Sequence, residues 1–254
     1  MVANTDVKTT LTDCLRELHL PTFREHFEES ARRAQQETLS YEQYLLELAN
    51  RECETRRTNR VERLLRDSNL PWDKTLQNFD LKRLPTKVSR QVRTLSDGSF
   101  VDRRENLLVF GKNGSGKTHL LSGIGHELVR SGRKVCFRTC CLLVQELLIA
   151  KRDLKLSKVL KQLARFEALI IDDIGYVQQS REEMEVLFTL LAERYERGSV
   201  LLTSNLPFGK WEQIFKDPMT TAAAIDRLVH HSVILELNIP SYRLEQAQAA
   251  QATA

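Results

Sequence analysis

Apolar residues recur at helical spacing through residues 10–66, a stretch that contains no strand signal. A first helix carries Leu11, Leu15 and Leu18 on one face, and Pro21 is placed to start a second. We therefore expect the chain to begin with helices that bury one face each.

A long third helix is predicted to follow. Ser40 to Gln43 has the form of a capping box, in which a serine and a glutamine each satisfy a backbone N–H of the first turn. Residues 50–60 are almost wholly polar, so we expect the middle of this helix to be exposed. The residues Asn69-Leu-Pro-Trp72 end it. The sequence thus predicts an all-helical N-terminal domain over residues 1–75.

From Asn106 onward, short apolar runs alternate with helical segments, a pattern typical of a parallel α/β sheet. The strands are predicted at 107–110, 135–137, 168–171, 199–203 and 233–237. The helices are predicted at 117–130, 141–151, 155–165 and 181–196, and Leu142, Leu143, Leu147 and Leu148 are expected to form a packing face. The fold class is therefore α/β, with a five-stranded parallel sheet in a core over residues 76–243 and a flexible tail over 244–254.

The segment Gly111-Lys-Asn-Gly-Ser-Gly-Lys-Thr118 matches the phosphate-binding pattern G-x-x-x-x-G-K-[ST] and lies between a predicted strand and a predicted helix. Its glycines let backbone N–H groups converge on phosphate oxygens at a helix N-terminus. We expect Lys117 to reach the β- and γ-phosphates of ATP and Thr118 to bind Mg²⁺. The predicted nucleotide contacts are Gly111, Asn113, Gly114, Ser115, Gly116, Lys117, Thr118 and His119.

Polar residues follow two of the predicted strands directly. Asp172 and Asp173 come after the apolar run 168–171; we expect Asp172 to hold Mg²⁺ and Asp173 to polarise the attacking water. Asn205 follows the next strand, at the sheet edge where α/β proteins bind ligands, and is predicted to bond the γ-phosphate and that water. An ordinary turn at Ser204 to Pro207 is the alternative for Asn205.

The net charge of +4 is unevenly distributed. Basic residues dominate three stretches, 51–66, 82–104 and 151–165, while both ends of the chain are acidic. Each stretch alone could be a solvated helix face, but the three together favour a polyanionic partner. Within the third stretch, the residues that we expect to contact the phosphates of such a partner are Lys151, Arg152, Lys155, Lys158 and Lys161.

Other compositional signals exclude several classes of protein. The five cysteines form no C-x-x-C pair, which argues against a zinc finger or a disulfide framework. No window approaches the roughly 18 uninterrupted apolar residues of a membrane span, and the N-terminus does not have the pattern of a signal peptide. We therefore expect a cytoplasmic protein without a membrane partner.

Several of these motifs together resemble the IstB-like AAA+ ATPases, the transposition helper proteins of bacterial insertion sequences, which are related to DnaC helicase loaders and DnaA initiators. The resemblance is strongest over residues 105–243. It rests on the phosphate loop with His119-Leu, Asp172-Asp-Ile-Gly-Tyr176, Arg194-Tyr-Glu-Arg-Gly198, Thr203-Ser-Asn-Leu-Pro-Phe208, Ala224-Ile-Asp-Arg-Leu228 and Ser241-Tyr-Arg243.

The resemblance implies a AAA+ core that binds Mg·ATP, oligomerises on duplex DNA with little sequence preference and delivers or stimulates a transposase encoded by the same element. It also implies that Arg227 is an arginine finger acting on a neighbouring subunit's ATP; pairing with Asp226 or Glu236 is the alternative. Arg194 is a second candidate for the interface, and Arg243 a candidate phosphate contact. Asp173 stands where many AAA+ ATPases have glutamate, which implies slow hydrolysis.

Two rival functions remain open from the sequence. A DnaC-like replicative helicase loader would differ in the protein that it engages. A P-loop small-molecule kinase would use the same phosphate loop, but it would have no use for three basic stretches or for an arginine directed at a neighbour.

Overall fold

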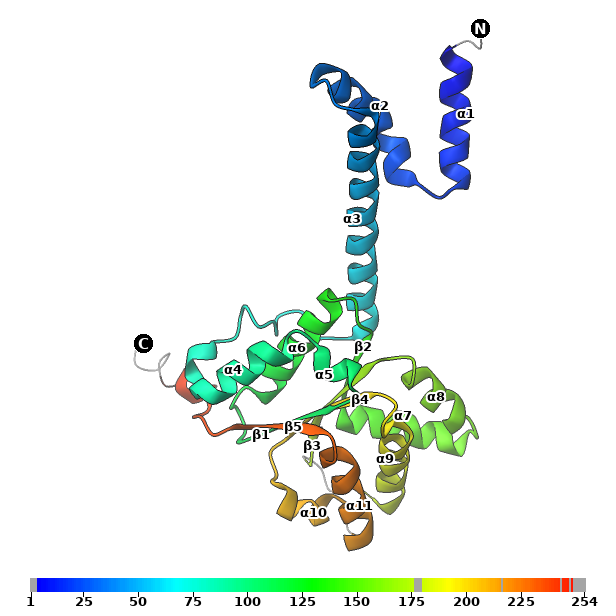
Figure 1. Cartoon of the computed structure of the whole chain (residues 1–254). Coiled ribbons are helices and arrows are strands. Elements are labelled where there is room, and N and C mark those ends of the chain that lie inside the picture. The colour runs from blue at the N-terminus through cyan, green and yellow to red at the C-terminus, as the bar shows by residue number, and fades with distance from the viewer. Residues whose placement is uncertain (1–3, 176–179, 216, 243, 247, 249–254) are drawn as a thin grey trace. The chain divides into compact units, whose positions relative to one another are not determined.

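The computed structural model describes residues 4–175, 180–215, 217–242, 244–246 and 248 (Figure 1). The chain forms two compact units, Met1–Arg63 and Leu64–Ala254. The boundary predicted after residue 75 and the tail predicted over 244–254 stay predictions. Among the described residues, no helix is both long enough and apolar enough to cross a membrane.

The N-terminal unit is helical, as its periodicity predicts. It consists of α1 (Asn4–Glu17), α2 (Pro21–Gln36) and most of α3 (Tyr41–Ser68). The capping box is present, because Ser40 N donates to Gln43 Oε1 at 2.8 Å and Gln43 N donates to Ser40 Oγ at 3.3 Å. Residues 53–60 of α3 are exposed, as expected.

Glu52 departs from that exposed pattern. It is buried, accepts a hydrogen bond from Thr22 N at 2.9 Å and pairs with Arg56 at 2.7 Å. The Arg56 guanidinium also donates to the carbonyl of His19 at 2.6 Å. A buried carboxylate needs such partners, so Glu52 and Arg56 link α3 to the start of α2.

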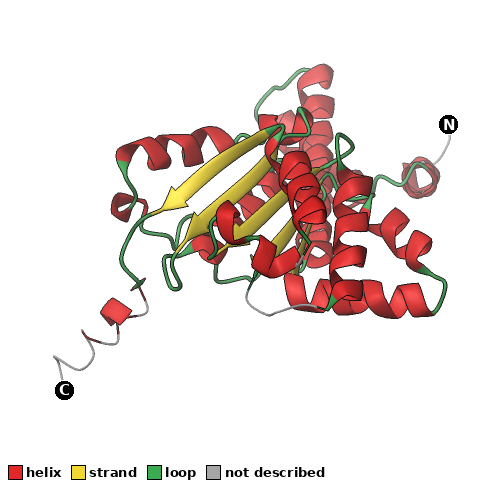
Figure 2. Cartoon of the chain, turned by 90° about the horizontal axis from the view of Figure 1, so that it is seen from below, coloured by secondary structure: helices red, strands yellow, loops and turns green. Residues whose placement is uncertain are grey.

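The second unit contains the predicted five-stranded parallel sheet, and the strand order is β2-β3-β4-β1-β5 (Figure 2). Its strands are β1 (Asn106–Gly111), β2 (Val135–Thr139), β3 (Ala168–Ile174), β4 (Ser199–Ser204) and β5 (Ser232–Leu237). Leu108, Ile170 and Leu201 are fully buried. Helices cover both faces of a parallel sheet, which is why its central strands are continuously apolar.

The four predicted helices of this unit are present, with bounds that differ by no more than about two residues: α6 (Lys117–Arg130), α7 (Cys140–Arg152), α8 (Leu156–Leu163) and α9 (Arg181–Arg194). The unit also contains helical elements that the sequence did not predict, namely η1 (Leu81–Arg83), α4 (Thr86–Leu95), α5 (Ser99–Asp102), η2 (Phe208–Lys210), α10 (Glu212–Phe215) and α11 (Pro218–Val229). A second capping box, between Ser180 and Glu183, begins α9. One expected core position is wrong: Leu142 is 63% exposed, and Leu143, Val144 and Leu147 form the buried face of α7.

Candidate functional site

The phosphate loop joins β1 to α6, and two of its glycines are required by geometry. Gly114 and Gly116 have φ angles of 78° and 88°, in the left-handed region that side chains rarely adopt. A Cβ atom would lie 2.0 Å from Ser241 Oγ at Gly114 and 2.9 Å from Phe79 Cε2 at Gly116. Other parts of the protein therefore approach the loop closely at both glycines.

Gly111 and Ser115 pack the loop against strand β5. A Cβ atom at Gly111 would lie 2.7 Å from Ser115 Oγ and 2.8 Å from the carbonyl oxygen of Leu237 in β5. Gly111 thus permits the loop to lie close to the sheet. Ser115, which belongs to the loop, is buried. Their predicted direct contact with nucleotide stays a prediction.

Lys117 is the first residue of α6 and is only 5% exposed. Its Nζ donates to the carbonyl oxygen of Lys112 at 3.1 Å, so the ammonium group folds back over the loop. A cavity of about 280 Å³ adjoins it, and its lining is formed by Lys74, Asn113, Gly114, Gly116, Lys117, Thr118, His119, Asp173 and Tyr242. Six of the eight residues predicted to contact nucleotide, Lys117 among them, therefore line one cavity.

Thr118, Asp172 and Thr203 form a hydrogen-bonded chain across α6, β3 and β4. Thr118 Oγ1 donates to Asp172 Oδ1 at 2.9 Å, and Thr203 Oγ1 donates to the same oxygen at 2.6 Å. Burial raises the pKa of Asp172, while the hydrogen bond from Thr203 opposes this rise. A bound cation would remove the cost of keeping the carboxylate ionised there.

Asp173 is exposed and lines the cavity, although its neighbour Asp172 is buried. The pairing register between β3 and β4 shifts between Ile171 and Ile174, and Asp173 has a φ of 60°. Its backbone N–H donates to Thr203 Oγ1 at 2.7 Å, which helps to hold this strained conformation. Because of the shift in register, two adjacent carboxylates differ in exposure: Asp172 is buried, and Asp173 lines the cavity.

A second cavity of about 150 Å³ shares Gly116, His119 and Tyr242 with the first. Phe79 lines it and meets the His119 ring edge-on, with centroids 5.3 Å apart. Tyr242 N donates to the carbonyl oxygen of Gly114 at 3.0 Å, and Arg83 lies over the Tyr242 ring at 5.0 Å. These residues bring two distant segments, around 79–83 and 239–242, to the phosphate loop.

Sequence reasoning missed Lys74 and Tyr242 as cavity residues. Tyr242 lies in the motif Ser241-Tyr-Arg243, so a signal was present, whereas no motif marks Lys74. Arg243 and Tyr176, which belong to the motifs above, lie outside the described residues. Asn205 follows β4 and is half-buried, and it does not line either of these two cavities; its catalytic role stays a prediction.

Arg227 lies in the last turn of α11, at the amino end of the sheet. The side-chain amide of Asn106, the first residue of β1, donates to the carbonyl oxygens of Arg227 at 3.4 Å and Leu228 at 3.0 Å. The phosphate loop begins at the other end of β1, about 17 Å away for a strand of this length. Arg227 therefore cannot serve its own phosphate loop in this conformation.

The Arg227 guanidinium lies over the Phe188 ring at 4.7 Å and donates to the carbonyl oxygen of Ala223 at 3.1 Å. Of the ion pairs within the described residues, none joins it to Asp226 or Glu236, so the alternative pairing is not observed. The Arg227 side chain is half-buried in this position.

The expectation that Arg194 lies at an interface is wrong. Arg194 is 4% exposed, and burial lowers its pKa to about 10. Its guanidinium donates to four carbonyl oxygens, those of Leu163, Phe166, Glu167 and Ser199, at 3.0–3.3 Å. This arginine joins the segment before β3 to the first residue of β4.

The five residues predicted to contact DNA are spread over the end of α7, the turn after it and α8. Arg152, Lys155, Lys158 and Lys161 are exposed. Lys151 is half-buried and pairs with Glu185 of α9 at 2.9 Å, and Lys155 pairs with Asp153 at 3.2 Å. Lys158 and Lys161 on α8 thus carry the exposed charge best placed for a partner.

The residues at the cavity fit ATP with Mg²⁺. The loop turns at glycines whose Cβ positions are taken by other atoms, a buried lysine lies over it, and a threonine hydroxyl and a carboxylate oxygen lie 2.9 Å apart beside it. Oxygen ligands of this kind suit Mg²⁺.

Comparison with known proteins agrees with this reading. The family described as IstB-like ATP binding protein matches residues 13–250. An insertion sequence ATP-binding protein of Sinorhizobium fredii is 39% identical over 98% of this chain and 84% of its own length. The IS5376 ATP-binding protein of Geobacillus stearothermophilus is 37% identical over 94% of this chain and 96% of its own length.

Among solved structures, a DnaC helicase loader matches 66% of this chain and 98% of its own with a TM-score of 0.57 and 16% identity, which is a likeness of fold. The predicted AAA+ core and the predicted family resemblance are both confirmed. The chain therefore belongs to the IstB-like ATP-binding family and is an ATPase with the AAA+ fold.

Proposed function

We propose that this ATPase is a transposition helper that assembles on duplex DNA with ATP and presents the DNA to the transposase encoded by the same element. The observation that carries the nucleotide part is the chain of hydrogen bonds from Thr118 to Asp172 to Thr203 beside the phosphate loop. Family membership over residues 13–250, which includes most of the N-terminal unit, supports the transposition part.

In this proposal the cavity beside Lys117 receives the triphosphate, and the cavity beside Phe79 and Tyr242 receives the base. Lys117 moves from the Lys112 carbonyl to the β- and γ-phosphates, an exchange that replaces a neutral acceptor by an anionic one. Thr118 and Asp172 hold Mg²⁺, which neutralises phosphate charge when bound. Asp173 accepts a hydrogen bond from the attacking water, and Asn205 orients the same water.

Asp173→Asn should keep ATP binding and reduce the steady-state hydrolysis rate by about 10²–10⁴-fold, because an amide cannot accept the proton of the attacking water. Rates of phosphate release measured beside fluorescent-nucleotide titrations separate these effects. Glu212→Gln, which removes another exposed carboxylate from the same unit, should leave both quantities unchanged. Hydrolysis at the normal rate in Asp173→Asn would remove Asp173 from the mechanism.

The proposed oligomer follows from where Arg227 lies. Since its own phosphate loop is at the opposite end of β1, an arginine finger here acts only on the ATP of a second copy. A subunit without a neighbour would then hydrolyse ATP slowly, and assembly on DNA would switch hydrolysis on.

The proposed DNA surface is α8 with the end of α7. No aromatic residue lies between the basic positions of 151–165, so stacking on unpaired bases is not indicated, and contacts with duplex phosphates fit better. Affinity for duplex should then depend strongly on salt and weakly on base sequence.

Lys158→Ala with Lys161→Ala should weaken binding to unrelated duplexes by similar factors. It should also flatten the slope of log K against log salt by about 1.8 per protomer, since each phosphate contact adds about 0.9. Fluorescence anisotropy at several salt concentrations measures both quantities. The matched comparison is Arg57→Ala with Arg60→Ala, which spares Arg56 because that residue holds Glu52.

An unchanged slope in the Lys158 and Lys161 variant would refute α8 as the DNA surface. If the slope were flattened in the Arg57 and Arg60 variant and not in the Lys158 and Lys161 variant, α3 would be the surface that binds DNA. ATP binding without DNA should be normal in both variants, because neither pair lines the cavity at the phosphate loop.

The transposase is favoured over a replicative helicase as partner because the relatives that match most of this chain are insertion sequence proteins. In a strand-transfer assay, the chain with ATP should raise the product yield of the transposase from the same element. If the chain left transposase activity unchanged and instead loaded a replicative helicase onto DNA, the loader alternative would be favoured. ATP-dependent phosphorylation of a small molecule would favour the kinase.

A further inference from the structure

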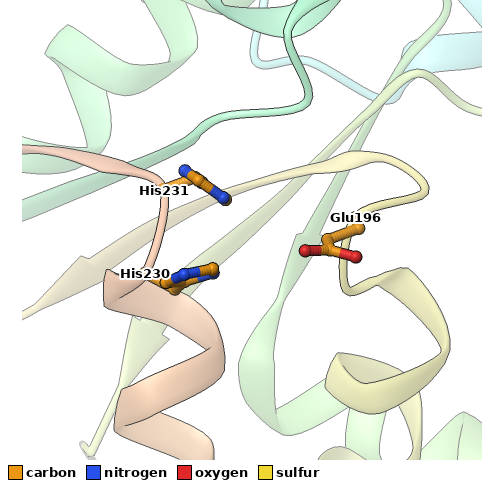
Figure 3. Close-up of side chains that lie close together, drawn as sticks. All are labelled: Glu196, His230 and His231. Carbon is orange, nitrogen blue, oxygen red and sulfur yellow. The ribbon is translucent and has the colours of Figure 1, made fainter.

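Three potential metal ligands meet at the amino end of the sheet, away from the phosphate loop. Glu196 lies in the turn before β4, and His230 and His231 lie in the turn before β5. One imidazole nitrogen of each histidine and one carboxylate oxygen of Glu196 lie within 4.8 Å of one another. Both imidazoles project toward Glu196 (Figure 3).

The backbone on both sides of this cluster is held by hydrogen bonds. Arg104 Nη1 donates to the carbonyl oxygen of Glu196 at 2.7 Å, and Glu196 itself has a φ of 57°. Asn106 N donates to the carbonyl oxygen of His231 at 2.7 Å, and His230 N donates to that of Asp226 at 3.0 Å. The three side chains therefore project from fixed points, although all three are exposed.

The two histidines are adjacent in sequence, yet their rings lie together. Their centroids are 4.1 Å apart with an interplanar angle of 50°, whereas adjacent residues of a strand point to opposite faces. The turn between α11 and β5 produces this arrangement. Tyr195 Oη lies 2.8 Å from His230 Nδ1, a hydrogen bond that orients the ring and leaves Nε2 as the second nitrogen that could bind a ligand.

We propose that Glu196, His230 and His231 bind a divalent transition-metal ion, with Zn²⁺ as the best fit. Zn²⁺ is commonly bound by two imidazoles and a carboxylate, with water in the fourth position. Mg²⁺ and Ca²⁺ prefer oxygen ligands to imidazole nitrogen. Tetrahedral coordination at about 2.0–2.2 Å requires the ligand atoms to approach to about 3.3 Å of one another. Rotation of exposed side chains provides this movement without a change in backbone.

A metal ion here would join the turn before β4 to the turn before β5. His230 directly follows α11, the helix whose last turn carries Arg227, so bound metal would restrain the end of that helix. Binding itself requires neither nucleotide nor DNA. The test of this metal site is therefore independent of the proposed function.

The test uses the full chain without an affinity tag, stripped with a chelator and titrated with Zn²⁺ against a chromogenic competitor, with no nucleotide present. We expect one Zn²⁺ per chain. His230→Ala, His231→Ala and Glu196→Gln should each weaken binding by at least about 10–100-fold, and Tyr195→Phe, a positioning change, by about 10-fold. The matched control is His26→Ala, because His26 lies 3.6 Å from Glu29 but belongs to no group of three potential metal ligands among the described residues.

Substitution with Co²⁺ identifies the ligands independently of any variant. A Co²⁺ spectrum with visible d–d bands and no sulfur-to-cobalt charge-transfer band in the near-ultraviolet supports the proposed nitrogen and oxygen ligands. Such a band would place the metal at the exposed Cys14, Cys53 or Cys141 and overturn the proposal. Equal Zn²⁺ affinity in the wild type and in the double variant His230→Ala, His231→Ala would overturn it as well, and circular dichroism checks that each variant is folded.

Discussion

Lys117→Ala should lower ATP affinity by about 30- to 5,000-fold, and ATP-dependent assembly on DNA should be lost with it. Lys117 is a buried cation at the start of α6, and the triphosphate is an anion that the loop must strip of water. Removing one member of a buried charge pair costs about 2–5 kcal/mol, which corresponds to that range. Isothermal titration with ATP measures the affinity, and light scattering with duplex DNA measures assembly.

Lys112→Ala is the matched control for this prediction. Lys112 is an exposed cation in the same loop, and its backbone carbonyl, which accepts the hydrogen bond from Lys117, survives the substitution. Its ATP affinity should stay close to that of the wild type. Equal losses in the two variants would mean that the loop attracts phosphate by its overall charge and that Lys117 has no special position.

Arg227→Ala should bind ATP normally and hydrolyse it about 10³–10⁵-fold more slowly in the assembled state. The reason is that the missing guanidinium belongs to the transition state in a neighbouring subunit, whereas every group around the variant's own cavity is intact. Arg197→Ala is the control, because Arg197 is an exposed arginine paired with Glu193 at 3.0 Å near the same end of the sheet.

Mixing variants tests whether the finger acts between subunits. An Asp173→Asn subunit keeps Arg227 and binds ATP, while an Arg227→Ala subunit keeps Asp173 and the phosphate loop. In a mixed oligomer some interfaces combine both intact parts, so hydrolysis should partly return although each variant alone is inactive. If the two variants assemble together and no ratio restores activity, Arg227 does not act in trans.

The strands and the phosphate loop were predictable from the sequence because both depend on local patterns. A parallel strand covered on both faces reads as a continuous apolar run, as at 168–171, and a tight anion-binding turn demands glycine at fixed spacing. The capping boxes at Ser40 and Ser180 are local too, since each joins residues three positions apart. Such patterns can be recognised in the sequence without knowledge of any distant contact.

Other features of the site depend on residues far apart in the chain. The sequence placed Asp172 beside Mg²⁺, but only the fold shows that Thr203 and Thr118 bond the same carboxylate oxygen from other elements. The shift in register between β3 and β4 that exposes Asp173 has no local signature. Lys74 reaches the cavity from before the core, where no motif marks it.

The errors have the same origin. Helical periodicity places Leu142 with its apolar neighbours, and the family resemblance suggests an interface role for Arg194, yet Leu142 is exposed and Arg194 is buried among four carbonyl oxygens. Spacing along a helix defines its faces but not which face another element covers. The sequence by itself therefore determined the family, the strands and the phosphate loop, while tertiary packing decided which polar groups are buried and which residues complete the site, because burial depends on contacts between distant segments.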